Sequence, residues 1–343
     1  MVIGHTESPF TNYIYLFHMA VFFMASGYFW NEKHIVTFKS LVKYVIAKIK
    51  ALYFPYLICN IILLIIEKIF LYGDERMSPI LFAKEVIVSF VKTSLFVGSV
   101  ELGGPTWFFG CLLLVTVGYA MLFFVVNKIT ILHKNKMIVH IAFWVACILI
   151  SWGIDSGVVD FGIEFLNRLF PAYCVYELGM FIRKIEEEKI YSNLLNIELS
   201  NKTYNIVYFI SSATGLLILN CLGSISIATC KIVNPIFFAL TSCLGWIMLS
   251  SLSASLPQIL KELMIYLGKN TKVIVCWHLL SFKIVTYIYI LCNNSSIERM
   301  REFPTLKEPS GLWPVYSFVG ITFPLVMHSI LKKVIKKETY KKI

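Results

Sequence analysis

Ionisable side chains stand inside several long apolar runs of this sequence, where they are costly to bury and therefore mark candidate functional sites. Three of them are histidines: His5, His18 and His278. A neutral imidazole is a good general base near pH 7. These histidines are therefore candidates for general-base chemistry, such as activating an alcohol for attack on a thioester. Each histidine also has a structural interpretation, in which the ring bonds a backbone carbonyl or caps a helix, and the residue types alone leave both open.

Glu177 is a carboxylate inside another apolar run, 165–182. A buried carboxylate needs a partner to offset the loss of its hydration. The partners that the sequence offers are Arg168, His18 and His278.

Three further residues are candidates for contacts with a substrate: Ser26, Tyr28 and Trp107. Ser26-Gly27 is a pair of small residues, which is typical of close helix packing. A nucleophilic serine is disfavoured, because no G-x-S-x-G elbow is present to activate it. Trp107 is either a member of an interfacial aromatic belt or a platform on which a sugar ring stacks.

Basic residues at two places predict a phosphate-binding site. Lys48 and Lys50 end a Lys-rich segment, and Lys269-Asn270 precede an apolar run. We expect Asn270 or Thr271 to cap the helix that begins there, so that its free backbone N–H groups and Lys269 form an anion site. The segment is not a P-loop, since the motif G-x-x-x-x-G-K-[ST] is absent.

The composition is that of a membrane protein. Of 343 residues, 58% are hydrophobic and 15% are charged, whereas soluble domains carry roughly 45–50% apolar and about 25% charged residues. Since a transmembrane helix needs about 20 apolar residues, the sequence predicts an all-α, polytopic transmembrane helix bundle with nine full spans. These are 11–30, 52–71, 105–126, 137–153, 165–182, 204–223, 232–252, 272–292 and 312–331. We expect residues 1–5 to be the end of a truncated first helix, which makes ten.

The distribution of Lys and Arg predicts the orientation. Most of the 31 such residues fall in one set of alternate connections, 31–51, 127–137, 183–203, 253–272 and the tail 332–343. We therefore predict that this set, with the C-terminus, is cytoplasmic. The segment 31–51 is interpreted as a basic amphipathic helix on the inner leaflet and the tail as a basic anchor. A second amphipathic stretch, 78–98, falls on the outer side. No connection is long enough for a further domain, so 1–343 is predicted to be one integral membrane domain.

Two other classes of partner are disfavoured. The net charge of +11 would suggest nucleic acid for a soluble protein, but the positive-inside rule explains these basic residues better. The nine Cys residues lie mostly in apolar runs, with no CxxC pair and no zinc-type Cys/His spacing. We interpret them as buried small hydrophobic residues and predict no metal site.

Several short motifs follow one another along nearly the whole chain. The most specific is the block from Phe17-His18-Met19 to Ser26-Gly27-Tyr28, which is similar to F-H-M-P-L-F-F-F-x-S-G-Y with Ala20 at the usual Pro position. The others are Ile3-Gly4-His5, Lys50 with Phe54-Pro55-Tyr56, Trp107-Phe108, Leu178-Gly179 with Phe181, and Gly268-Lys269-Asn270-Thr271 followed by His278. Together they resemble the membrane-bound acyltransferase family 3, most closely its branch of fucose 4-O-acetylase-like proteins.

This resemblance implies a ten-helix membrane fold that transfers an acyl group from acyl-CoA to a hydroxyl of an extracytoplasmic or lipid-linked glycan. It implies that His5 is the catalytic residue, and that an arginine about three helical turns earlier would precede Met1. We accordingly expect acetyl-CoA as donor, a carbohydrate acceptor and a place in the plasma membrane.

The roles that we expect from the resemblance are divided among three groups. His5 acts as the base or carries the acyl group, with His18, Glu177 and His278 as the other catalytic candidates. Trp107, Ser26 and Tyr28 contact the acceptor. Lys48, Lys50, Lys269 and Asn270 bind the CoA phosphates.

Two alternatives remain open at this stage. One is a secondary transporter or flippase of a polyprenyl-linked sugar, which shares the number of spans and the buried His and Glu residues. Transporters of this kind are expected to have paired broken helices and internal repeats, and the sequence shows neither. The other is a non-catalytic membrane scaffold.

Overall fold

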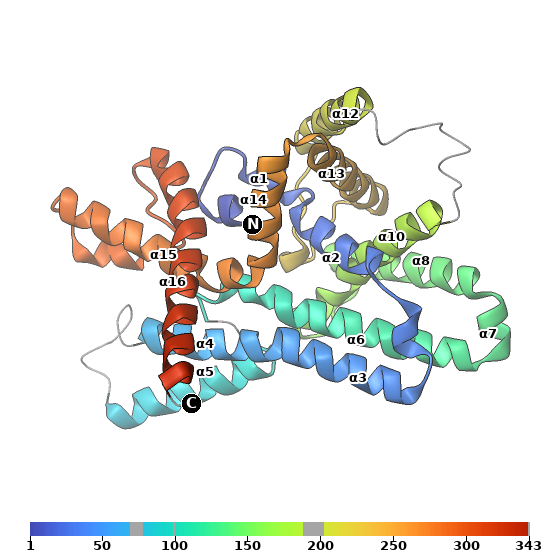
Figure 1. Ribbon diagram of the computed structural model, residues 1–343, viewed down its shortest axis with the longest axis horizontal. Helices are drawn as coiled ribbons and strands as arrows, with labels where there is room; N and C mark the ends of the chain where they lie inside the picture. The colour runs from blue at the N-terminus through green and yellow to red at the C-terminus, as the bar shows by residue number, and fades with distance from the viewer. Residues whose placement is uncertain (69–77, 99, 188–201, 342–343) are drawn as a thin grey trace. The chain divides into compact units, whose positions relative to one another are not determined.

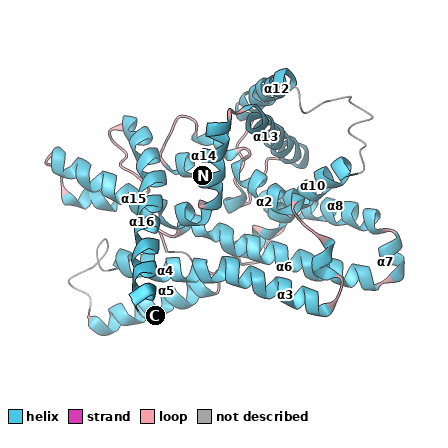
Figure 2. Ribbon diagram, viewed as in Figure 1, coloured by secondary structure: helices cyan, strands magenta, loops and turns pink. Residues whose placement is uncertain are grey.

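The chain folds into helices joined by loops, as the computed structural model shows for residues 1–68, 78–98, 100–187 and 202–341 (Figures 1 and 2). Within these ranges the β-type pairing is a single bridge between Ser226 and Lys231. The predicted all-α fold class is confirmed. The α-helices are α1 (Thr11–Tyr15), α2 (His18–Tyr28), α3 (Phe38–Lys48), α4 (Phe54–Ile66), α5 (Pro79–Ser94), α6 (Trp107–Lys128), α7 (Thr130–Lys134), α8 (Lys136–Asp155), α9 (Glu164–Asn167), α10 (Leu169–Glu187), α12 (Lys202–Asn220), α13 (Pro235–Ser255), α14 (Gln258–Lys269), α15 (Thr271–Cys292) and α16 (Trp313–Lys341).

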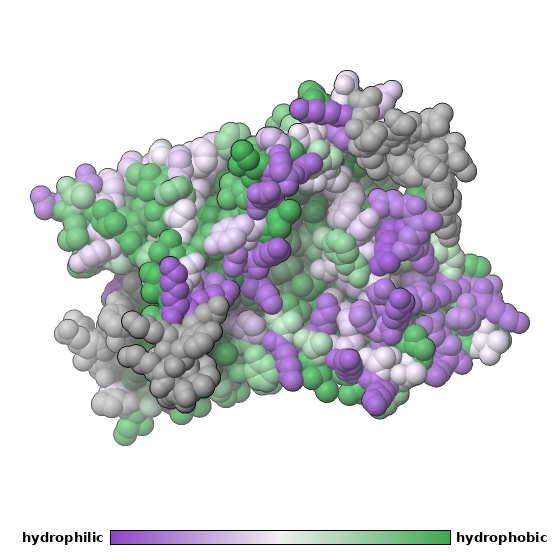
Figure 3. Space-filling model, viewed as in Figure 1, coloured by the Kyte–Doolittle hydropathy of each residue, from purple (hydrophilic) through white to green (hydrophobic). Residues whose placement is uncertain are grey.

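Six helical segments of the described chain are long and apolar enough to cross a membrane. They are Phe38–Ile66, Gly104–Lys128, Lys136–Asp155, Pro235–Ser255, Thr271–Cys292 and Trp313–Val334. Each overlaps one of the predicted spans, and helices also occupy the other three predicted positions, in α1 with α2, in α10 and in α12. Large apolar side chains remain exposed on these helices, such as Ile138 at 65% and Leu149 at 53% on α8. Figure 3 shows hydrophobic residues over much of the visible surface. Exposed apolar surface of this kind is expected where helices face lipid.

The predicted span 11–30 is not one continuous helix. Between α1 and α2 the backbone of Phe17 leaves the helical region, at φ −138° and ψ −25°. The carbonyl of Ile14 accepts hydrogen bonds from the Phe17 N–H at 3.3 Å and from Nδ1 of His18 at 2.9 Å. A side chain thus takes the place of the backbone donor that would continue α1, and His18 begins a new helix.

The segment 31–51 runs on into the helix that follows it. Thr37 and Ser40 form a capping box at the start of α3, each hydroxyl accepting from the other residue's backbone N–H. α3 then passes through a π-helical turn, Ile49–Tyr53, into α4, which gives one helical run over Phe38–Ile66. Two further basic connections also contain helix, because α14 occupies most of 253–272 and α16 continues through the tail to Lys341. The stretch 78–98 is helical as expected, in α5, with Ser78 as its N-cap.

The chain forms two compact units, each assembled from segments far apart in the sequence. The first unit contains 1–11, 55–107 and 262–343. In it, α15 packs along α16, and a 3₁₀ turn, η1 (Val2–His5), contacts both helices. The second unit contains 12–54 and 108–261. In it, α10 packs against α2 and α8, and α13 packs against α12 and α2.

Glycine allows α2 and α10 to approach closely in the second unit. A Cβ atom on Gly179 would collide with the backbone carbonyl of Met24, and one on Gly27 would collide with the carbonyl of Tyr176. The two glycines therefore face the partner helix reciprocally. The close packing predicted for the Ser26-Gly27 pair is present at Gly27.

Gly179→Val is expected to destabilise the protein, because the two backbones must separate to admit the added side chain. Overpacking of this kind costs about 1–3 kcal/mol. The apparent melting temperature of the detergent-solubilised chain measures the effect. Gly268→Ala is the matched control, since a Cβ atom there meets open space and alanine favours a helix by about 1 kcal/mol over glycine. Equal melting temperatures for Gly179→Val and the unaltered chain would contradict this account of how α2 and α10 pack.

Candidate active site

Two of the predicted catalytic histidines lie side by side in the first unit. His5 ends η1, and His278 lies two turns inside α15. Their ring centroids are 5.4 Å apart, with the ring planes at 40°. Both residues stand out in the sequence, but no sequence pattern predicts that they meet.

Contacts at a glycine and at a serine of α16 hold η1 in place. The side chains of Val2 and Phe282 pack closely against Gly320 of α16, where an added Cβ atom would collide with them. Beyond His5, the Thr6 hydroxyl lies 3.5 Å from the hydroxyl of Ser317, also on α16. These contacts bring the start of the chain against the α15–α16 pair and so position His5 beside His278.

The hydrogen bonds of His278 determine which of its ring nitrogens carries the proton. Nδ1 lies 3.0 Å from the carbonyl oxygen of Ile274 and 3.1 Å from that of Val275. A carbonyl oxygen can only accept, so the neutral ring must be protonated at Nδ1, and Nε2 keeps its lone pair. Nε2 is buried and has no hydrogen-bond partner in the described part of the chain. This lone pair belongs to the ring that lies beside His5, and it can accept a proton.

His18 has the same tautomer in the second unit. Its Nδ1 lies 2.9 Å from the carbonyl of Ile14, so the proton is on Nδ1 and Nε2 is the basic nitrogen. The ring is buried and lies 5.0 Å from that of Tyr15. The interpretation of His18 as a carbonyl-bonding histidine is therefore correct for Nδ1, and its role in catalysis stays a prediction.

The partner of Glu177 is a residue that the sequence analysis missed. Nδ1 of His140, on α8, lies 2.5 Å from Oε1 of Glu177, on α10. The Tyr119 hydroxyl lies 3.2 Å from the same nitrogen. Glu177 is fully buried and His140 is 1% exposed. Arg168, proposed above as a partner, instead pairs with Glu164 and donates to the carbonyl of Ala228.

His140 was visible in the sequence as a histidine inside a predicted span, 137–153. A polar residue at that depth was a signal of the same kind as Glu177. Its pairing depends on how α8 packs against α10. Oε2 of Glu177 and Nε2 of His140 have no partner among the described residues, so this buried pair retains two unused hydrogen-bonding positions.

The hydroxyls of Ser26 and Tyr28 are both engaged by the protein. Ser26 Oγ donates to the carbonyl of Phe22 in its own helix, at 3.1 Å. The Tyr28 hydroxyl donates to Oε2 of Glu186 at 2.5 Å, at an exposed end of the helix. Their assignment to substrate binding stays a prediction.

Trp107 is the first residue of α6. It belongs to the first unit and is partly exposed. The turn before it, η5 (Gly104–Thr106), contacts α15, the helix that carries His278. Asn60 of α4 holds this turn by donating from Nδ2 to Thr106 Oγ1 at 2.9 Å. Trp107 thus follows a turn that is fixed against the histidine-bearing helix.

The four residues predicted to bind phosphates lie in separate units. Lys48 and Lys50 belong to the second unit, and Lys269 and Asn270 belong to the first. Asn270 is the N-cap residue of α15, as predicted, but its side chain makes no capping hydrogen bond. Its Nδ2 instead donates backward to the carbonyl of Tyr266, at 2.9 Å. The side chain bonds this carbonyl and not the helix start, because α14 runs almost directly into α15. The four residues remain a predicted CoA site.

Lys48 stands next to two stacked rings. Its Nζ lies 5.2 Å from the centroid of Tyr44, and His34 stacks on Tyr44 at 4.7 Å. Burial, and secondarily the positive charge of Lys48, lower the pKa of His34. Both effects favour the neutral form of the His34 ring.

Comparison with known proteins identifies the family. A family model described as an acyltransferase domain matches residues 1–328. No curated protein and no solved structure matches the sequence. Because the match covers nearly the whole chain and the chain contains several long apolar helices, this multi-pass membrane protein belongs to acyltransferase family 3.

Proposed function

We propose that this acyltransferase moves an acetyl group from acetyl-CoA to a hydroxyl group of a cell-surface or lipid-linked carbohydrate, at the plasma membrane. The family supports the transfer of an acyl group. The observation that carries the proposal is the pair of His5 and His278, with a buried lone pair on His278 Nε2 that has no partner among the described residues. Transfer to a hydroxyl requires such a base, because an uncharged hydroxyl is a weak nucleophile.

The proposed reaction uses the pair as a proton carrier. His5 takes the proton of the acceptor hydroxyl while the oxygen attacks the carbonyl carbon of the thioester. The new C–O bond forms, the C–S bond breaks, and its electron pair leaves with the sulfur of CoA. The protonated imidazole then returns the proton to the thiolate. The ring centroid of His278 lies 5.4 Å from that of His5, and we propose that its Nε2 lone pair stabilises the protonated ring of His5 during the transfer.

Basic residues support entry of the donor from the cytoplasmic side. Figure 3 shows hydrophilic residues gathered over α7 and the neighbouring end of α10. Lys134, Lys136 and Lys184 belong to these elements or directly adjoin them, and the same elements border the connections predicted to be cytoplasmic. We propose that Lys48, Lys50, Lys269 and Asn270 meet the CoA phosphates and that the C-terminus is cytoplasmic.

The direct test uses membranes that contain the chain, acetyl-CoA labelled in its acetyl group, and the surface glycan of the producing cell after mild alkali has removed its O-acetyl esters. The expected result is alkali-labile label in the glycan, absent from membranes without the chain. Palmitoyl-CoA serves as the donor control and is expected to be a poor substrate.

Two results would reject this function. Label that enters lipid or protein while the glycan stays unlabelled would assign another acceptor. Movement of a lipid-linked sugar across sealed vesicles without acetyl-CoA would favour the transporter alternative.

A further inference from the structure

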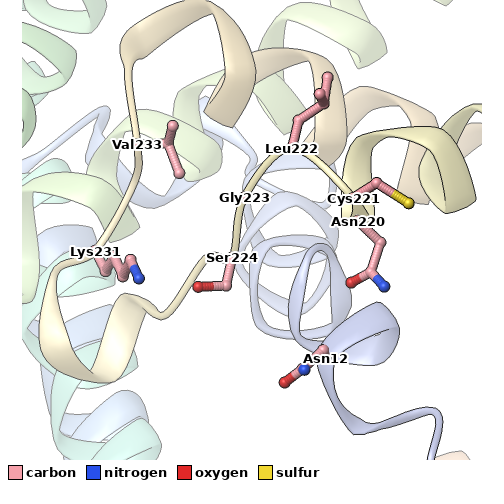
Figure 4. Close-up of a pocket in the computed structure, with 8 residues that line it drawn as sticks. All are labelled: Asn12, Asn220, Cys221, Leu222, Gly223, Ser224, Lys231 and Val233. Carbon is pink, nitrogen blue, oxygen red and sulfur yellow. The ribbon is translucent and has the colours of Figure 1, made fainter.

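A pocket of about 470 Å³, lined by both polar and apolar residues, lies entirely within the second unit, between α1 and the loop that joins α12 to α13 (Figure 4). Its lining residues are Asn12, Asn220, Cys221, Leu222, Gly223, Ser224, Lys231 and Val233. The amide of Asn220 points toward Asn12, and the Ser224 hydroxyl and the Lys231 amine point toward each other (Figure 4). The polar groups of two separate elements thus converge on one space.

The loop that forms most of this wall is fastened at several points. Asp155, at the end of α8, accepts from the backbone N–H groups of Ile232 and Val233 at 3.0 and 2.9 Å. Ser226 and Lys231 exchange two backbone hydrogen bonds across the loop. Arg168 Nε donates to the carbonyl of Ala228 at 2.5 Å. The shape of the pocket is therefore defined before any ligand binds, which lowers the entropic cost of binding.

One lining residue holds a costly backbone conformation. Val233 has φ +67°, a region in which a β-branched residue is a genuine outlier. Its N–H is the group that Asp155 holds. Strain that the surroundings enforce is typical of ligand-binding positions. Gly223 lies opposite, where an added Cβ would come within 2.9 Å of a Val233 methyl group, so glycine keeps this part of the wall open.

The lining chemistry fits a ligand with many hydroxyl groups. Two amides and one hydroxyl offer both donors and acceptors, and Oδ1 of Asn220 is buried without a partner in the described chain. Lys231 is the one charged side chain among the eight lining residues. None of these eight is a carboxylate, so a metal ion or a cationic ligand is disfavoured. A neutral or singly acidic sugar ring satisfies all of these groups.

The size and position of the pocket agree with this ligand. Ligand pockets typically measure about 300–1,000 Å³, and 470 Å³ suits one sugar unit with its neighbouring linkage. The loop 221–234 and the chain before α1 are both connections that the distribution of Lys and Arg places on the outer side. That is the side on which a surface glycan is met.

We propose that this pocket binds one monosaccharide unit of the glycan that accepts the acyl group. Asn12 and Asn220 bond neighbouring ring hydroxyls, and Ser224 and Lys231 bond the opposite edge of the ring. The identity of the ligand as the acceptor rests on the proposed function, whereas the binding of a saccharide is tested separately.

The test measures binding of the de-O-acetylated surface glycan to the purified, full-length chain in detergent, with no donor present. Asn12→Ala/Asn220→Ala is expected to weaken binding about tenfold, as the loss of two hydrogen bonds does. Lys231→Met is a second variant that changes only an exposed side chain, since the backbone of Lys231 makes the pairing with Ser226. Asn135→Ala is the matched control, an exposed amide in a connection predicted to be cytoplasmic, and its binding is expected to be unchanged.

A kinetic arm separates this inference from the proposed function. With labelled acetyl-CoA, the double variant is expected to raise the KM for glycan about tenfold and to leave the KM for acetyl-CoA unchanged. Wild-type affinity in both the double variant and Lys231→Met would overturn the pocket while leaving the reaction in place. Failure of the unaltered chain to bind the glycan would also overturn it. Weakened binding in the variants of a chain that transfers no acetyl group would support the pocket and reject the function alone.

Discussion

His278→Ala is expected to lower the rate of acyl transfer about 10²–10⁴-fold, the range that one positioned acid–base group contributes. The substitution removes a ring whose proton is held on Nδ1 by the carbonyls of Ile274 and Val275. It thereby removes the Nε2 lone pair next to His5. His5→Ala is expected to have an effect of the same order, because the two rings carry the transferred proton together. The measurement is the initial rate of labelled acetyl transfer at equal amounts of protein in the membrane.

His133→Ala is the control, because it removes a histidine that lies outside the proposed active site. His133 is in α7, where it is exposed and bonds the side chain of Asn127. Its activity is expected to match that of the unaltered chain. If His278→Ala reached the membrane normally and kept full activity, His278 would be a structural residue that satisfies backbone carbonyls, and the proposed base would have to be sought elsewhere.

His140→Leu is expected to destabilise the protein by about 3 kcal/mol, the upper part of the range for leaving a buried polar group without its hydrogen-bond partner. Glu177 then stays buried without the 2.5 Å contact to His140. The apparent melting temperature measures this loss. A thiol-reactive dye reports unfolding well in this chain, because most of its cysteines are buried.

A double variant distinguishes a lost partner from a general packing defect. His140→Leu/Glu177→Leu removes both polar groups, so the melting temperature is expected to recover most of the loss. Glu187→Gln on the same helix is the control: its pair with Arg183 is exposed, and such pairs contribute about 0–1 kcal/mol. A double variant less stable than His140→Leu alone would show that the two residues are not held mainly by each other.

Local sequence patterns were sufficient for the helices and for selecting His5 and His278 as candidate residues. Apolar runs long enough to span a membrane coincide with α6, α8, α13, α15 and the membrane part of α16. His5 and His278 stood out because each is a polar residue in apolar surroundings. Both signals are properties of a short window of sequence, which explains why they are readable without the fold.

Other features depended on side chains that bond backbone. The ring of His18 takes the carbonyl of Ile14 and divides the span 11–30. Asn270 occupies the N-cap position of α15, but its side chain bonds back to the carbonyl of Tyr266. A residue type that can cap a helix can also bond the turn before it, and propensity alone does not choose between the two.

The apolar runs by themselves determined that this chain is an all-α membrane protein. Within lipid a helix satisfies its backbone hydrogen bonds internally, and a run long enough to form such a helix is a property of local sequence. Only the tertiary structure decided which polar side chains meet. His5 joins His278, and His140 joins Glu177, across long stretches of chain. Such pairs depend on which helices pack together and how closely, and at α2 and α10 that distance is set by the absence of a side chain at Gly27 and Gly179.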